Sequence, residues 1–452
     1  NDTQGLVVSL TTVSVPEGGN ANFTLMLAAQ PTSSVTVTTA WLSGDTNLSV
    51  SNGATLAFNT GDWNLPKNVT LTAAEDEDDI DGTAEFTIAS TGMAPVNITA
   101  NETDNDAVRI FVNASRPDDN GDGLSWATAK KTIQAAVDLA TDGMVILVTN
   151  GNYNVGGRVT PGASLSNRVV ITKNITVRSV NGPDVTIIEG SGTGAYDTPA
   201  AMRCIYMSRG KLAGFTLTAG ATLATNAWTA YNSAGGAVNM YNAAPGTLVT
   251  NCLLFDNKAK YGGGSAYANL DSCTLSDNWA AYGGGASGDS RFTLNHCTIS
   301  DNVAYTGGGV HGTIQVSNCL ISKNSAQWGG GAYQATVNNC VISSNTATPY
   351  YGGGIRSATA NSCLIIANRA TRGGGSHAST LYNSTLYGNV ADEGGGGSDA
   401  DSLRNSIVWG NSLTNGTTSD VAGDDYRYTC ASDLPSTNGC ISTNPMFVAA
   451  GA

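Results

Sequence analysis

Short segments in which every second residue is apolar fill the first part of the chain. Residues 21–27, 34–38, 69–72 and 84–88 follow this pattern, and turn-forming residues separate them at short intervals. A period of two gives a strand one face toward a core and one face toward solvent. Regularly spaced short strands are typical of sandwich domains, so we predict a small antiparallel Ig-like β-sandwich over residues 1–106.

The pattern changes to a helical one near residue 125. Ile133, Ala136, Val137 and Ala140 follow the i, i+3, i+4, i+7 spacing that places side chains on one face of a helix. We therefore predict a helix over about residues 125–141. A terminal helix of this kind covers the open hydrophobic end of a repeat array.

From residue 251 onward the sequence repeats with a period of about 22 residues. Each repeat has a Cys, then an Asn, and then a run of Gly residues. The Cys column is Cys252, Cys273, Cys297, Cys319, Cys340 and Cys363, continued by Ser384 and Ser406. The Asn column is Asn257, Asn278, Asn302, Asn324, Asn345, Asn368, Asn389 and Asn411. The Gly runs begin at Gly262, Gly283, Gly307, Gly329, Gly352, Gly373 and Gly394.

This period fits one coil of a parallel β-helix, in which coils stack about 4.8 Å apart and crossovers are right-handed. We predict a right-handed parallel β-helix over residues 107–452, clearest over residues 251–412, behind the N-terminal capping helix. The Cys column then points inward as free, buried thiols, the Asn column lies in a turn, and the Gly runs form tight corners. Cys430 and Cys440 lie outside the columns, so we expect a local disulfide between them.

Three short motifs of the predicted sandwich resemble the Calx-β family: VPEGG at 15–19, EDEDD at 75–79 with DG at 81–82, and DND at 104–106. The resemblance implies Ca²⁺ binding by acidic loops at one end of the sandwich, and Ca²⁺ favours several oxygen ligands. The candidate ligands are Glu17, Asp76, Asp78, Asp79, Asp104 and Asp106. The alternative is a solvated acidic loop in an acidic protein.

The alternation of Gly runs and Asn motifs resembles the passenger repeats of polymorphic outer-membrane autotransporters. Residues 405–411 and 444–448 also resemble bacterial surface β-helix proteins that carry a C-terminal anchor or sorting segment. These resemblances cover most of residues 107–448. They imply surface display and adhesion.

Composition narrows the function classes further. The chain has 452 residues, 55 of them Gly, with 12% charged residues and a net charge of −14. An acidic surface repels nucleic acids and anionic membranes, and no apolar run reaches the ~20 residues of a membrane span. The chain starts without Met or a signal peptide, as we expect of a processed secreted protein. Its sequons, which would permit glycosylation there, are at Asn22, Asn47, Asn68, Asn97, Asn101, Asn113, Asn174, Asn383 and Asn415.

One column of repeat positions is a candidate catalytic face. It lies two residues after the Gly runs, contains His311, Tyr333, Arg356 and His377, and ends at Ser398. A base beside a guanidinium fits β-elimination from a uronate, as in polysaccharide lyases. The alternative is a solvent-facing strand of mixed polar residues.

A second column, directly before the Gly runs, is rich in aromatic residues. It contains Tyr261, Tyr282, Trp328 and Tyr351. Aromatic residues at this spacing would form a flat platform for sugar rings. They would equally serve as packing that shields a Gly-rich corner.

We expect a secreted, non-catalytic structural or adhesive protein of the cell surface or extracellular space. Its expected partners are other surface proteins or glycans, and exposed solenoid ends would permit head-to-tail association into fibres. The alternative is a polysaccharide lyase or epimerase acting on acidic glycans, or a carbohydrate-binding module. The expected cofactor is structural Ca²⁺.

Overall fold

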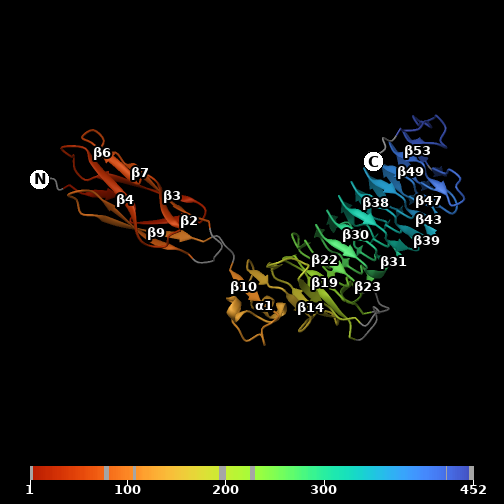
Figure 1. Ribbon diagram of the computed structural model, residues 1–452, viewed down its shortest axis with the longest axis horizontal. Coiled ribbons are helices and arrows are strands. Elements are labelled where there is room, and N and C mark those ends of the chain that lie inside the picture. Colours follow the sequence, from red (N-terminus) through yellow and green to blue (C-terminus); the bar gives the residue numbers. More distant parts are fainter. Residues whose placement is uncertain are drawn as a thin grey trace. The chain divides into compact units, whose positions relative to one another are not determined.

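The computed structural model describes residues 4–75, 81–104, 108–192, 200–223, 230–423 and 425–446. The chain forms two compact units, Asn1–Val108 and Arg109–Ala452, and each has its own hydrophobic core. Both units consist almost entirely of β-strands (Figure 1), which confirms the all-β fold class.

The first unit is a sandwich of a four-stranded sheet, with strand order β1-β3-β7-β5, and a five-stranded sheet, with order β2-β9-β8-β4-β6. Neighbouring strands are antiparallel, except that β2 and β9 are parallel. Alternate residues such as Phe23, Leu25 and Phe86 are buried between the sheets, as the period of two predicts. The strands are β1 (Leu6–Val8), β2 (Thr12–Pro16), β3 (Asn20–Leu27), β4 (Val35–Gly44), β5 (Leu48–Asn52), β6 (Thr55–Phe58), β7 (Lys67–Ala73), β8 (Thr83–Ala89) and β9 (Val96–Thr103).

The second unit is a right-handed parallel β-helix, which confirms the predicted fold. From β23 (Lys258–Tyr261) onward each coil passes through four sheets, which we number 1 to 4 in the order that the chain visits them; among the described residues, the earlier coils have no strand in sheet 3. Sheet 1 is 13-stranded and runs from β10 (Arg109–Val112) to β53 (Asp425–Arg427). Sheet 2 is 12-stranded and runs from β12 (Gly151–Tyr153) to β54 (Cys430–Ala431).

Sheets 3 and 4 meet at the Gly runs. Sheet 3 is 8-stranded and consists of β23 (Lys258–Tyr261), β27 (Trp279–Tyr282), β31 (Val303–Thr306), β35 (Ser325–Ala326), β39 (Thr346–Tyr351), β43 (Arg369–Arg372), β47 (Val390–Ala391) and β51 (Ser412–Leu413). Sheet 4 is 12-stranded and consists of β13 (Arg158–Val159), β14 (Ser166–Ile171), β17 (Met202–Met207), β20 (Val238–Asn239), β24 (Ser265–Ala266), β28 (Ala286–Ser287), β32 (Val310–His311), β36 (Ala332–Tyr333), β40 (Ile355–Arg356), β44 (Ser376–His377), β48 (Ser398–Asp399) and β52 (Val421–Ala422).

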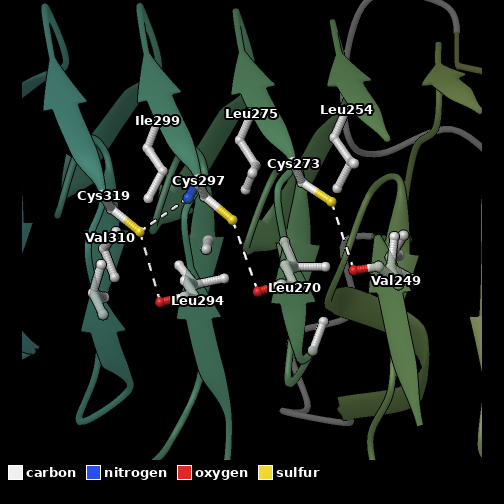
Figure 2. Close-up of a cluster of buried hydrophobic side chains, with 14 of the residues drawn as sticks. Val249, Leu254, Leu270, Cys273, Leu275, Leu294, Cys297, Ile299, Val310 and Cys319 are labelled. Atoms are coloured by element: carbon white, nitrogen blue, oxygen red, sulfur yellow. Dashed lines mark hydrogen bonds between the residues drawn. The ribbon is translucent and has the colours of Figure 1, made fainter. Parts of the chain in front are cut away.

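Inward-facing residues of successive coils stack in columns. Leu275 and Ile299 are paired in register and fully buried. In Figure 2 the thiols of Cys273, Cys297 and Cys319 lie beside this column, each between 3.6 and 3.8 Å from a carbonyl oxygen of the preceding coil. All the thiols of the Cys column are free and buried, which confirms the prediction.

The Asn column forms a buried hydrogen-bonded ladder at the turn between sheets 2 and 3. The Nδ2 group of Asn324 donates to the Ile299 carbonyl at 2.8 Å and to Oδ1 of Asn345 at 3.0 Å. Oδ1 of Asn324 accepts from the backbone N and the Nδ2 of Asn302, at 3.0 and 2.9 Å. Every member of the column is at most 1% exposed. Each amide therefore satisfies backbone groups that a tight turn would leave without partners.

The Gly runs form the corner between sheets 3 and 4. The first residue of a run has positive φ, for example 63° at Gly329. The second lies so close to the neighbouring coil that a Cβ at Gly330 would be 2.5 Å from the carbonyl oxygens of Gly353 and Thr346. Only Gly fits both requirements, as the sequence predicted.

The capping helix is shorter than the predicted range 125–141. A 3₁₀ turn, η1 (Trp126–Thr128), precedes α1 (Ile133–Leu139). Between them Lys130 forms a parallel bridge with Val112 at the end of β10, so this stretch extends the sheet and does not continue the helix. The side chain of Thr132 then caps the N-terminus of α1. The apolar face of α1 belongs to the core of the first coils, and a second short helix, α2 (Ala230–Ser233), precedes β20.

The predicted disulfide between Cys430 and Cys440 is not formed, and both cysteines are free thiols. Cys430 is paired with Ile441, so Cys440 lies level with Thr429. Residues one position apart on paired strands point to opposite faces of a sheet. Cys440 accordingly points inward, where its Sγ accepts from the backbone N of Thr429 at 3.4 Å, while the thiol of Cys430 lies 3.4 Å from the Thr443 carbonyl.

Candidate functional site

The predicted catalytic column faces outward from sheet 4. Parallel pairing places its members on consecutive coils in the order His311, Tyr333, Arg356 and His377. The next member is Asp399 and not Ser398, because the last Gly run has four residues where the others have three. Ser398 points inward and is fully buried.

The Gly corner brings the two predicted columns together. The residue directly before a Gly run on one coil contacts the residue two positions after the Gly run on the next coil. Ring centroids are 5.3 Å apart for Tyr282 and His311, and 4.7 Å apart for Tyr351 and His377. We call the joint surface the corner strip; its members are Tyr261, Tyr282, His311, Trp328, Tyr333, Tyr350, Tyr351, Arg356, Arg372, His377 and Asp399.

The aromatic rings of the corner strip do not form one flat platform. Tyr261 and Tyr282 stack on each other, with centroids 5.0 Å apart and planes at 13°. The indole of Trp328 stacks on Tyr350 at 4.2 Å, and the Arg356 guanidinium carbon lies 3.9 Å from the indole centroid. Since two groups this close cannot share one ring face, the indole lies between them. Tyr350, at 38%, is the most exposed ring of this stack.

Arg356 is the central cation of the strip. Besides the indole, the rings of Tyr333 and Tyr351 each lie 5.6 Å from its guanidinium carbon. Among the residues that the structure describes, no carboxylate is within ion-pair distance of Arg356, and its buried Nε has no acceptor. Burial lowers the pKa of Arg356, which measures the cost of holding this cation among the rings.

Arg372, on the next coil, has a carboxylate partner. Its Nε and Nη2 donate to the two oxygens of Asp399, at 2.8 and 3.1 Å. The side chain of Asp399 is 2% exposed, and this bidentate pair raises the pKa of Arg372. The corner thus accommodates a planar guanidinium–carboxylate pair where the chain itself supplies both groups.

Burial disfavours the charged form of both histidines of the strip. Burial lowers the pKa of His311 to about 4, and its ring stacks on Tyr333 with centroids 5.5 Å apart. Burial is also the main cause of a lowered pKa at His377. The Nδ1 atom of His377 is buried and has no hydrogen-bond partner in the described part of the chain. A buried N–H without an acceptor costs more than a bare nitrogen, so we place the proton on Nε2.

At His377 the tautomer favours donating a hydrogen bond over abstracting a proton. A general base must offer an unprotonated atom to the substrate. With its proton on Nε2, His377 presents a donor, and the Tyr333 ring covers one face of the His311 imidazole. The strip therefore combines hydrogen-bond donors, aromatic rings and two guanidinium groups, one of them paired with Asp399.

The predicted calcium ligands are only partly described. Asp76, Asp78, Asp79 and Asp106 lie outside the described residues, while Glu17 is buried in the first unit. The backbone N of Asp104 donates to the carboxylate of Asp81 at 2.8 Å. Within the described ranges, no group of three or more His, Cys, Asp or Glu residues is arranged to hold a metal ion.

Two carboxylates that the sequence analysis did not select converge near this region. A Cβ at Gly82 would lie 2.0 Å from Oδ2 of Asp45 and 2.5 Å from Oε2 of Glu102. Glu102 is 4% exposed, at an inward position of β9 where the period of two places an apolar residue. An all-carboxylate donor set of this kind fits Ca²⁺ better than a softer metal. The break in alternation at Glu102 is the sequence signal that could have identified it.

The sequons differ in exposure. Half-buried asparagines are Asn47, Asn101 and Asn113, and exposed ones are Asn22, Asn68, Asn97, Asn174, Asn383 and Asn415. Asn383 lies in a turn with φ of 50°, where its Oδ1 accepts from Nδ2 of Asn405. Glycosylation stays a prediction at all of them.

Comparison with known proteins gives a distant likeness to enzymes that act on polysaccharides. No family model and no curated protein matches the sequence. The chain is similar to the pectate lyase Pel9A, with TM-score 0.41 and 13% identity over 74% of this chain and 81% of that one. It is also similar to a rhamnogalacturonan lyase, with TM-score 0.36 and 9% identity over 71% of this chain and 87% of that one. Likeness at this level says nothing about activity. Within the described residues, no helix has the length and apolar character that a membrane crossing needs.

Proposed function

We propose that this chain is a secreted, non-catalytic adhesive protein whose β-helix binds glycans along the corner strip. The observation that carries the proposal is the continuity of the strip, which places aromatic and hydrogen-bonding side chains on consecutive coils. Coils stack about 4.8 Å apart, so the strip is a linear row of contacts suited to an extended polymer. Aromatic and hydroxyl groups together match the apolar faces and hydroxyls of sugars.

One observation also favours a second candidate, a polysaccharide lyase or epimerase. Tyr333, Arg356 and His377 lie beside one another on three paired strands. A cation beside a phenol and an imidazole is a set that could stabilise and form an enolate. The proton that we place on Nε2 argues against His377 as the base of this candidate, because its other nitrogen, Nδ1, is buried.

The first experiment measures binding of the purified chain to immobilised neutral and acidic polysaccharides, and in parallel follows the ultraviolet absorbance of an unsaturated uronate product. We expect saturable binding to at least one polysaccharide and no product. Loss of the exposed ring in Tyr350→Ala should weaken binding about three- to tenfold, the range expected for one aromatic contact.

Tyr382→Ala is the matched control. Tyr382 is 41% exposed, close to the exposure of Tyr350, but it lies in sheet 1, in β45 (Thr380–Tyr382). Its loss should leave binding unchanged. Formation of unsaturated product would replace the proposal with the lyase candidate. Equal effects of the two substitutions, or no binding to any polysaccharide, would contradict binding along the strip.

A further inference from the structure

The two arginines of the corner strip occupy contrasting electrostatic environments. Arg372 is bidentate with Asp399, whereas Arg356 is flanked by three aromatic rings and, among described residues, by no carboxylate within ion-pair distance. Both belong to the same corner, one coil apart. The corner therefore has one completed guanidinium–carboxylate pair and one guanidinium whose anion is not supplied by the described chain.

The aromatic rings around Arg356 restrict the orientation of its guanidinium group in a way that suits an anion. Its guanidinium lies over the Trp328 indole at 3.9 Å, so the plane of the group is fixed by stacking. Stacking on a face leaves the edge of the guanidinium, with its Nη groups, as the part that can donate hydrogen bonds. A fixed planar edge matches a carboxylate or sulfate group through two parallel hydrogen bonds.

Neighbouring groups add to this preference. His377 follows Arg356 on the next coil, and with its proton on Nε2 it is a further neutral donor. Tyr333 precedes Arg356 and contributes a phenolic hydroxyl. Partial burial strengthens a charge-assisted hydrogen bond, because fewer water molecules compete for the guanidinium.

We propose that Arg356 is the binding site for one anionic group, a uronate carboxylate or a sulfate ester, of a glycan that lies along the corner strip. This inference rests on the proposed glycan binding and adds the class of ligand. The acidic net charge of the whole chain disfavours an anionic glycan at low salt, but exposed charges more than about 10 Å away are largely screened at moderate salt.

The experiment uses the full chain and three soluble probes of similar length. The first is an oligogalacturonide, the second is the same oligomer with its carboxyl groups reduced to alcohols, and the third is a sulfated oligomer of neutral sugars. Affinities are measured for the parent chain and for Arg356→Gln, Arg356→Lys and the control Arg178→Gln. Arg178 is exposed in sheet 1, in β15 (Thr176–Ser179), on another side of the coil. Circular dichroism and melting temperature verify that each variant is folded.

We expect Arg356→Gln to weaken binding of an anionic probe about tenfold or more and to change binding of the reduced probe less than about twofold. Arg356→Lys keeps the positive charge but loses the planar guanidinium. Its affinity for the anionic probe should therefore lie between the affinities of the parent chain and of Arg356→Gln. The oligogalacturonide and sulfated probes separately report whether carboxylate or sulfate is the group bound. Arg178→Gln should bind all three probes with the same affinity as the parent chain.

Different failures have different meanings. If the reduced probe binds as well as the anionic ones and Arg356→Gln has no selective effect, the anion site is refuted while glycan binding stands. If Arg356→Gln weakens all probes equally, Arg356 acts through the shape of the strip and the anion site is again refuted. If no probe binds the parent chain, both the anion site and the proposed function are refuted.

Discussion

His296 and His311 are the same residue type in two environments of one solenoid. The side chain of His296 is 59% exposed and lies 3.2 Å from the Asp271 carboxylate. His311 is largely buried, with its ring against Tyr333 and its pKa lowered to about 4. The two positions differ in sequence only by their place relative to the Cys and Gly columns. The column, and not the residue type, therefore determines whether the imidazole is buried or exposed.

The buried imidazole predicts a pH-dependent stability. His311 has a pKa of about 4 in the folded chain against an ordinary value of 6.5. As the pH falls below 6.5 the unfolded chain binds the proton first, so the free energy of unfolding decreases until about pH 4, where the folded chain is protonated as well. The full effect is about 3 kcal/mol. Urea unfolding at a series of pH values measures it.

His311→Phe should lose this part of the pH dependence, because the side chain at position 311 then binds no proton in either the folded or the unfolded chain. His296→Phe is the control and should keep it, since that imidazole is exposed. A His311→Phe profile that parallels the parent profile between pH 6.5 and 4 would show that the imidazole is not desolvated.

The turns are the elements that hold the solenoid in register. In the ladder of asparagines each side chain bonds both the coil before it and the coil after it, and the last one, Asn411, ends on the carboxylate of Asp420 at 2.9 and 3.0 Å. Asp420 in turn accepts from the backbone N of Ser432. The ladder thus has a charged acceptor at its C-terminal end, where no further Asn follows.

Removing one asparagine side chain of the ladder should lower the free energy of unfolding. In Asn324→Ala the backbone N and the Nδ2 of Asn302 lose the oxygen that both donate to, and Oδ1 of Asn345 loses the Nδ2 donor of Asn324. Each buried polar group left without a partner costs about 1–3 kcal/mol, so we expect a loss of roughly 3–5 kcal/mol in the free energy of unfolding, measured by denaturant titration.

Asn318→Gly is the matched control. Asn318 is exposed, donates to Oδ1 of Asn295 and has φ of 55°, which Gly also adopts. We expect a loss below about 1 kcal/mol there, since water replaces the hydrogen bond. Similar losses in the two variants would mean that the buried ladder contributes no more than surface hydrogen bonds do.

The position of each repeat column in the coil could be predicted from the sequence, whereas the contacts between columns could not. Sequence spacing predicted that Cys points inward, that Asn lies in a turn and that Gly forms the corner. Sequence spacing did not predict that the residue before one Gly run contacts the residue two positions after the following Gly run. Trp328 contacts Arg356 in this way. The extra residue in the last Gly run also shifted the predicted column from Asp399 to Ser398.

At the scale of the whole molecule the chain has two separate cores. The buried residues of the sandwich form one cluster, and those of the solenoid form another. Units with separate cores unfold in separate steps unless a large interface couples them. We therefore expect to resolve one thermal transition for each unit in calorimetry of the full chain.

We propose that Ca²⁺ stabilises the first unit through its acidic loops. The carboxylates of Asp45 and Glu102 that converge beside Gly82 support this proposal, because bound Ca²⁺ would offset their repulsion. A ligand at about 100 times its dissociation constant raises the free energy of unfolding by about 2.7 kcal/mol. For a domain of this size that corresponds to an increase of roughly 10 °C or more in melting temperature. Chelation should lower one calorimetric transition by that amount and leave the other in place.

Glu102→Gln separates this effect from general charge screening. It should remove most of the difference between chelated and calcium-loaded samples, whereas Glu85→Gln, an exposed carboxylate of the same sheet, should not. Identical melting curves with and without chelator would contradict a structural Ca²⁺ site.

The sequence by itself determined the solenoid, the sandwich and the chemistry of the turns. These features depend on local spacing: a period of two selects strands, a period near 22 selects coils, and Gly and Asn fit backbone conformations that other residues do not. Tertiary structure alone decided which side chains meet, whether Cys430 and Cys440 can form a disulfide, and which imidazoles are desolvated. Those properties depend on the register between coils and on how deeply the corner is buried, and one extra Gly or one residue of offset changes them. Arg356 was visible in the sequence, but its lack of a carboxylate partner among the described residues became visible only once the coils were stacked.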